Sequence, residues 1–215
     1  MKAVVDNDVL LKGARYGLLP QFVAAIPGTE GPVGVLGAAR YVVGDRISKR
    51  VLEGNTDAAL STFHEFLAEN IELEPTLDEQ YAASVLELSA QRAGVELDAG
   101  ESQLCSILVS RALPLFLTGD KRAICAIETL LDHCELLAPA AGKVMSLEQL
   151  IFALLEIAHV DTIRQAVCGR PTADRSLSIC FCCASGAPTS KGDVQAGISS
   201  YIRDLRQKAP RVLAA

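Results

Sequence analysis

The sequence predicts an α/β protein with three layers, α/β/α, and a short, mostly parallel sheet, followed by a helical C-terminal extension. Two observations support this fold class. Short apolar runs, such as residues 3–5 and 113–117, alternate with longer stretches of helical periodicity, and this alternation is typical of βα units. Half of the 215 residues are hydrophobic, so the chain can bury a large aliphatic core.

The first 140 residues carry the alternating pattern. The expected strands cover residues 3–5, 113–117 and 135–137. The expected helices run over residues 9–18 and 35–50, and others begin near residues 56, 77, 101 and 121. Asn7 or Asp8 can cap the first helix. Residues 76–79, Thr-Leu-Asp-Glu, fit a capping box for a helix that stops at Gly94.

The pattern changes after residue 140. Residues 146–158 read as a helix that can continue through 162–167, and residues 184–192 read as a loop. Residues 194–208 have the periodicity of a final amphipathic helix. We therefore expect an α/β domain over residues 1–140 and a mainly helical extension over 141–215.

Charge is unevenly distributed along the chain. The net charge is −6, with 12 basic and 22 acidic residues before residue 161, a balance of −10, and 8 basic and 4 acidic residues after it, a balance of +4. The acidic body argues against broad binding to phosphates. We expect any nucleic-acid footprint to lie on the C-terminal third, packed on or beside an acidic edge.

The N-terminus lacks the apolar run of a signal peptide, and the longest apolar stretch contains Glu156 and His159. We expect a soluble cytoplasmic protein that does not enter a membrane. Seven cysteines lie mostly among aliphatic residues, which favours buried free thiols and no disulfide framework. The cysteines at 168, 180, 182 and 183 lack the usual spacing of a zinc site.

Acidic residues cluster where the predicted strands and helices meet. Asp6 and Asp8 follow the first strand, and Asp120 follows the strand at 113–117. Asp98 and Glu101 begin the helix that leads into that strand. Because the carboxyl ends of parallel strands meet at one edge of a sheet, these carboxylates can converge. Such a cluster favours Mg²⁺ or Mn²⁺ and phosphoryl-transfer chemistry.

Each acid also has a purely structural interpretation. Asp98 and Glu101 have the spacing of a capping box, and Asp120 can be a simple helix cap. Asp8 can equally be a cap or a supporting residue. Asp6 is harder to explain in this way, because a carboxylate at the end of a buried strand is costly to desolvate without a partner.

Three segments resemble the first, third and fourth acidic motifs of the PIN-domain superfamily of metal-dependent ribonucleases: VVDNDVLL, LDAGESQLCSILVSR and LFLTGDKRAI. The resemblance covers about residues 1–138 and implies a PIN-like fold. It implies that Asp6, Glu101 and Asp120 are catalytic. It also implies that these three acids, together with Asp8 and Asp98, hold Mg²⁺ or Mn²⁺. The expected activity is endonucleolytic cleavage of single-stranded RNA. The residues expected to contact RNA are basic: Lys121, Arg122, Arg203 and Arg206.

The second acidic motif of the family is not evident in this sequence. Its acid should lie within residues 35–43, but that stretch reads VLGAARYVV, and Glu30 or Glu79 would need an unusual placement to replace it. An alternative is therefore a catalytically degenerate PIN-like module that binds nucleic acid or protein. A third candidate is a phosphohydrolase of the haloacid-dehalogenase type, because Asp6-Asn7-Asp8 has its D-x-D form. An antitoxin-like or other protein partner and a homodimer remain open.

Overall fold

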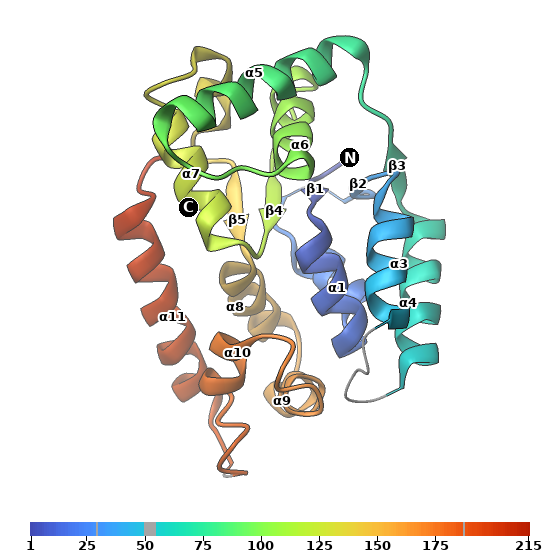
Figure 1. Cartoon of the computed structure of the whole chain (residues 1–215). Coiled ribbons are helices and arrows are strands. Elements are labelled where there is room, and N and C mark those ends of the chain that lie inside the picture. Colours follow the sequence, from blue (N-terminus) through green and yellow to red (C-terminus); the bar gives the residue numbers. More distant parts are fainter. Residues whose placement is uncertain (29, 50–54, 187) are drawn as a thin grey trace.

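The computed structural model describes residues 1–28, 30–49, 55–186 and 188–215. Five short strands form one sheet at the centre of the molecule (Figure 1). They are β1 (Val4–Val5), β2 (Gly34–Leu36), β3 (Ile71–Leu73), β4 (Phe116–Thr118) and β5 (Val144–Ser146). All neighbouring strands are parallel, in the order β3-β2-β1-β4-β5.

Helices make the connections that parallel pairing requires. Before β4 they are α1 (Asn7–Tyr16), α2 (Leu19–Ala25), α3 (Ala39–Lys49), α4 (Thr56–Glu69), α5 (Leu77–Ala93) and α6 (Ala99–Ser110). After β4 they are α7 (Lys121–Leu130), the 3₁₀ helix η1 (Glu135–Ala140), α8 (Leu147–Ile157), α9 (Val160–Cys168), α10 (Arg175–Cys180) and α11 (Lys191–Lys208).

The alternation of side chains along the strands divides the core into two layers. Val5 and Leu117 pack with α1 to α4 and α8 on one face of the sheet. Their neighbours in the chain, Val4 and Phe116, pack with α5, α6 and α7 on the other face. The predicted three-layer α/β/α fold is therefore confirmed.

Local signals located several helix ends correctly. Both capping boxes form, one between Thr76 and Glu79 and one between Asp98 and Glu101. Gly94 ends α5 in the left-handed conformation, at φ 68°, which glycine adopts without steric cost. The cap of α1 is a correction, because Asp6 caps this helix rather than Asn7 or Asp8.

Four strand assignments need correction. The start of the helix predicted over residues 35–50 is instead strand β2, and its predicted last residue, Arg50, lies outside the described residues. Residues 135–137, predicted as a strand, belong to η1. β3 and β5 were not predicted, and the pairing of each with a neighbouring strand decides them.

The sheet continues into the predicted extension. β5 pairs with β4, and Leu213 forms a parallel bridge to Val144. α8 and α11 pack against each other, and the helices predicted over residues 146–158, 162–167 and 194–208 are found as α8, α9 and α11. Ala187, within the predicted loop at 184–192, lies outside the described residues. The domain boundary at residue 140 stays a prediction.

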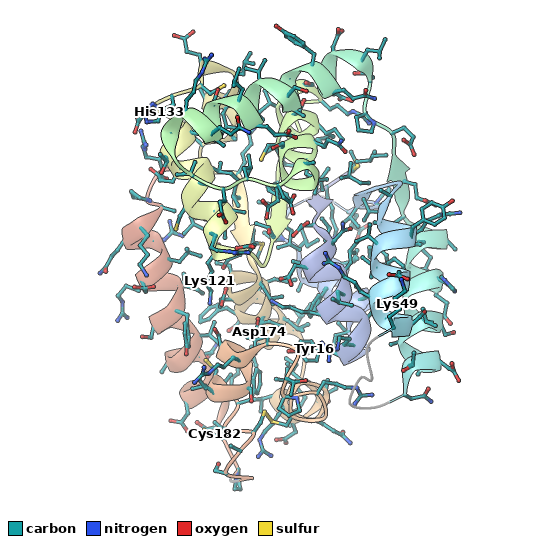
Figure 2. All side chains as sticks on the ribbon, viewed as in Figure 1. Tyr16, Lys49, Lys121, His133, Asp174 and Cys182 are labelled. Carbon is teal, nitrogen blue, oxygen red and sulfur yellow. A yellow bond between two sulfur atoms is a disulfide. The ribbon has the colours of Figure 1, made fainter. Side chains whose placement is uncertain are left out.

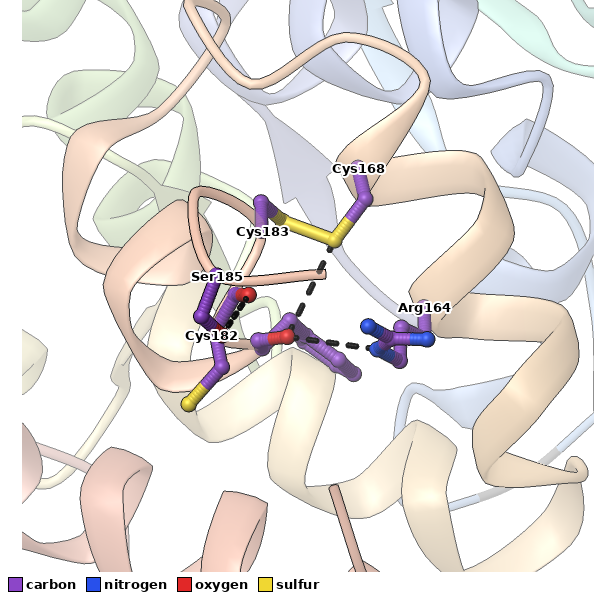
Figure 3. The surroundings of a disulfide bond; sticks show 6 residues. Arg164, Cys168, Cys182, Cys183 and Ser185 are labelled. Atoms are coloured by element: carbon purple, nitrogen blue, oxygen red, sulfur yellow. Dashed lines mark hydrogen bonds between the residues drawn. A yellow bond between two sulfur atoms is a disulfide. The ribbon is translucent and has the colours of Figure 1, made fainter. Parts of the chain in front are cut away.

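The absence of disulfides was predicted wrongly. Cys168, at the end of α9, is bonded to Cys183, which follows α10 (Figure 3). The exposed Cys182 is a free thiol whose side chain points away from this disulfide. Among the described residues, no helix has the length and apolar character needed to span a bilayer. The cytoplasmic location stays a prediction.

Candidate functional site

The topology places a crevice between β1 and β4. From β1 the chain passes to β2 on one side, and after β3 it returns to β4 on the other side of β1. Ligands of open parallel sheets bind at such a reversal, beyond the carboxyl ends of the strands. Val5 is in register with Leu117, and the Asp6 amide donates to the Leu117 carbonyl at 2.9 Å. Asp6 and Thr118 therefore leave the sheet side by side.

A pocket of about 510 Å³ lies at this crevice. Its lining includes all five carboxylates predicted from the sequence: Asp6, Asp8, Asp98, Glu101 and Asp120. They come from the ends of two strands and from the start of α6. The expected convergence on one pocket is therefore found.

Asp6 is buried at the base of the pocket, with 9% of its surface exposed. Its Oδ1 accepts a hydrogen bond from the Asn7 amide at 2.7 Å, and its Oδ2 accepts one from Thr118 Oγ1 at 3.2 Å. Burial, followed by the negative charges of Asp8 and Asp98, raises the pKa of Asp6 to about 6. Asp6 therefore caps α1 and is also a buried carboxylate of the cluster.

Glu101 is buried beside it, and Asp98 caps α6. The Glu101 amide donates to Asp98 Oδ1 at 2.8 Å, and the Asp98 amide donates to Glu101 Oε2 at 2.9 Å. Burial raises the pKa of Glu101 to about 8, and the charges of Asp98, Asp6 and Asp120 add to the effect. The two side chains that form this capping box thus also belong to the acidic cluster.

Asp120 caps α7 and is paired with a cation. Its Oδ1 accepts from the Arg122 amide at 2.8 Å, and its Oδ2 lies 2.9 Å from Arg122 Nη2. Burial opposes ionisation of Asp120, but the hydrogen bonds from Arg122 outweigh it and lower its pKa. Arg122 itself is largely exposed at the pocket.

Asp8 is held by Lys12, a residue that the sequence analysis missed. Lys12 Nζ lies 2.7 Å from Asp8 Oδ2 and 2.8 Å from Asp174 Oδ2. A Cβ at Gly119 would collide with Asp8 Oδ2, so the absence of a side chain there permits this close approach. The signal for Lys12 was its i, i+4 spacing from Asp8, whereas nothing in the sequence pointed to Asp174.

The predicted RNA-binding residues are dispersed. Arg122 lines the pocket. Lys121 pairs with Glu148 at 2.6 Å and donates to Ser176 Oγ at 3.1 Å. Arg203 and Arg206 line a different, more apolar pocket between α8 and α11. The structure thus brings Arg122 to the carboxylates but not Arg203 or Arg206.

The wall of the pocket formed by α3 and the turn before it carries no acid. This wall presents Ala38, Val42 and Arg46. Glu79 does not replace the missing acid, because its two carboxylate oxygens accept hydrogen bonds from Arg111 at 2.7 and 2.8 Å. Glu30 does not replace the missing acid either. Its charge acts on Lys2, which precedes β1 and therefore lies at the opposite end of this strand from the pocket.

The five acids that line the pocket suit a hard divalent cation, because such ions prefer carboxylate oxygens as ligands. Burial near like charges raises the pKa of Asp6 and of Glu101, and a cation would offset that repulsion. As the side chains stand in residues 1–28, 30–49, 55–186 and 188–215, no group of three or more acids, histidines or cysteines is arranged to hold a metal. Comparison with protein-family models, curated proteins and solved structures finds no match for the chain.

Proposed function

We propose that this chain is a Mg²⁺- or Mn²⁺-dependent endoribonuclease that cleaves single-stranded RNA, as its resemblance to PIN domains implies. The observation that carries the proposal is that Asp6, Glu101 and Asp120 line one pocket at the reversal point of a parallel sheet. Two of these acids have raised pKa values because they are buried near like charges. A divalent cation would relieve that repulsion.

Each side chain has a role in this proposal. Asp6, Glu101 and Asp120 would hold the ion, with Asp98 and Asp8 supporting them. When bound, the ion supplies positive charge that stabilises the scissile phosphate and acidifies a water molecule. Arg122, exposed at the pocket and hydrogen-bonded to Asp120, can contact a phosphate of the substrate.

The test is Mn²⁺ titration by calorimetry, combined with cleavage of a fluorescent single-stranded RNA. We expect Mn²⁺ binding in the micromolar to millimolar range and metal-dependent cleavage. Asp6→Asn and Glu101→Gln should abolish both, whereas Asp57→Asn, at an exposed position on α4, should change neither. Absence of Mn²⁺ binding in the wild-type chain would overturn the proposal.

A second candidate is a degenerate PIN-like module that binds nucleic acid or protein without cleavage. It is favoured by the wall that carries Ala38, Val42 and Arg46 where the family has an acid. Two of the five carboxylates are also already neutralised, Asp8 by Lys12 and Asp120 by Arg122. RNA binding without Mn²⁺ binding would select it. Hydrolysis of p-nitrophenyl phosphate that is lost in Asp6→Asn would instead select the phosphohydrolase.

A further inference from the structure

The concave surface of the candidate site continues along α3. The carboxylate pocket shares Val42 and Arg46 with a shallow hollow on α3, which Arg40, Tyr41 and Asp45 also line. That hollow in turn shares Arg40 and Tyr41 with a third one, which reaches His64 on α4. Figure 1 shows α3 lying between α1 and α4. A continuous path therefore leads from the carboxylates across α3 to α4.

The middle of this path exposes an aromatic ring. Tyr41 is 73% exposed, and Val42 beside it is 36% exposed, whereas the inward face of α3 buries Ala39, Val43 and Ile47. A ring in this position offers a flat apolar face to a ligand. Flat rings next to arginine are the surfaces on which unpaired nucleobases stack.

The charges on α3 identify one available cation. Arg40 Nε donates to Glu72 at 2.9 Å, and Lys49, at the far end of α3 in Figure 2, pairs with Asp45 at 2.8 Å. Arg46 is exposed and has no ion pair within the described parts of the chain. Arg46 borders both the carboxylate pocket and the Tyr41 hollow, so its guanidinium can bind an anion that lies between the two.

We infer that this α3 path binds a single-stranded nucleic acid, with a phosphate on Arg46 and the adjoining base stacked on Tyr41. The next nucleotide along the strand lies in the hollow between Tyr41 and His64. A base-paired duplex does not fit this role, because its bases are not free to stack on a side chain. The direction of the strand toward the carboxylates rests on the proposed nuclease function, but its binding to α3 does not.

The test measures the binding of a short fluorescein-labelled oligouridylate by anisotropy, in EDTA and low salt so that cleavage cannot occur. Tyr41→Ala should weaken binding about 5- to 150-fold, the range expected for one lost stacked base. Tyr41→Phe should restore it, because the ring remains. Arg46→Gln should weaken binding and reduce the slope of log affinity against log salt by about 0.7, as for one lost phosphate contact.

Matched controls lie on the opposite helical layer. Tyr81 on α5 is 73% exposed, like Tyr41, and Arg92 on α5 is exposed, so Tyr81→Ala and Arg92→Gln should leave affinity unchanged. Wild-type affinity in Tyr41→Ala, equal losses in the Tyr81→Ala control, or no binding by the wild-type chain would overturn the inference. RNA cleavage with Mn²⁺ would still support the nuclease in those cases. Binding through Tyr41 and Arg46 without cleavage would support the path and overturn the nuclease.

Discussion

Lys12 and Asp174 form an ion pair that joins the candidate site to the C-terminal part of the chain, with Lys12 Nζ 2.8 Å from Asp174 Oδ2. Their side chains are only 13% and 12% exposed. Figure 2 shows Asp174 near Tyr16, in the region where α10 approaches α1, and the charge of Asp174 also acts on Tyr16. Because Lys12 also pairs with Asp8, a residue beyond position 140 helps to position a carboxylate of the pocket.

Replacing Asp174 should therefore destabilise the protein. In Asp174→Asn, Lys12 loses one of two charged partners in a largely buried setting, and we expect a loss of about 1.5–3 kcal/mol in the free energy of unfolding. The measurement is urea denaturation followed by circular dichroism. Asp161→Asn is the control, because its side chain is 76% exposed and should contribute almost nothing. Equal midpoints for Asp174→Asn and the wild type would contradict the role of this pair.

Gly119→Ala should disturb Asp8 directly. The added methyl group would overlap the Asp8 carboxylate, so Asp8 must move away from Lys12, at a cost of about 1–3 kcal/mol in stability. Gly44→Ala is a matched control on α3, where an added Cβ meets open space. There the better helix propensity of alanine should raise stability by up to about 1 kcal/mol. Thermal melts of both variants check this, and a stable Gly119→Ala protein would show that the approach of Asp8 is not tight.

An acid introduced at Ala38 should strengthen the proposed metal site. Ala38 lines the pocket, so Ala38→Glu adds a carboxylate close to the cluster, and we expect Mn²⁺ to bind about tenfold more tightly. Gly37→Glu serves as the contrast. Gly37 is not among the residues that line the pocket, so this variant should leave the Mn²⁺ affinity unchanged. Calorimetric titration measures the Mn²⁺ affinity of both variants, and weaker Mn²⁺ binding by Ala38→Glu than by the wild type would contradict the prediction.

Glu79 should affect acid stability and not metal binding. Hydrogen bonds from Arg111 lower the pKa of Glu79 to about 2 in the folded protein, from an ordinary value of 4.5. A folded pKa below the unfolded one means that the stabilisation is fully present above about pH 4.5 and is lost as the pH falls toward 2. Glu79→Gln should therefore lower stability at pH 7 and flatten its dependence on pH between these values. Its Mn²⁺ affinity should equal that of the wild type, and abolished binding would place Glu79 in the site after all.

Much of the local structure could be predicted because the interactions that decide it lie within one helical turn. The capping boxes at Thr76 and Asp98 and the glycine stop at Gly94 each depend on residues no more than four positions apart. The first strand, with Asp6 at its end, was predicted for a similar reason, because a buried apolar run meets a polar turn. The arrival of the acids at one edge of the sheet then followed from the parallel pairing of the strands, because their carboxyl ends meet at that edge.

Other features depend on contacts between distant segments. β2, β3 and β5 depend on their neighbours, which supply their hydrogen bonds in the sheet. The pairing of Cys168 with Cys183 and that of Lys12 with Asp174 arise only once α9, α10 and α1 are packed.

The sequence by itself determined the α/β class, the acids and their arrival at one edge of the sheet, since burial of the strands and the parallel order allow little else. Local spacing accounts for the two cations that pair with these acids, because Lys12 lies four residues after Asp8 and Arg122 lies two residues after Asp120. Only the tertiary structure decided that Asp174 joins Lys12, that Arg46 borders the same pocket, and that Arg203 and Arg206 lie elsewhere. The physical reason is that contacts between distant segments depend on how the helices pack, and the sequence pattern of a helix surface does not specify that packing.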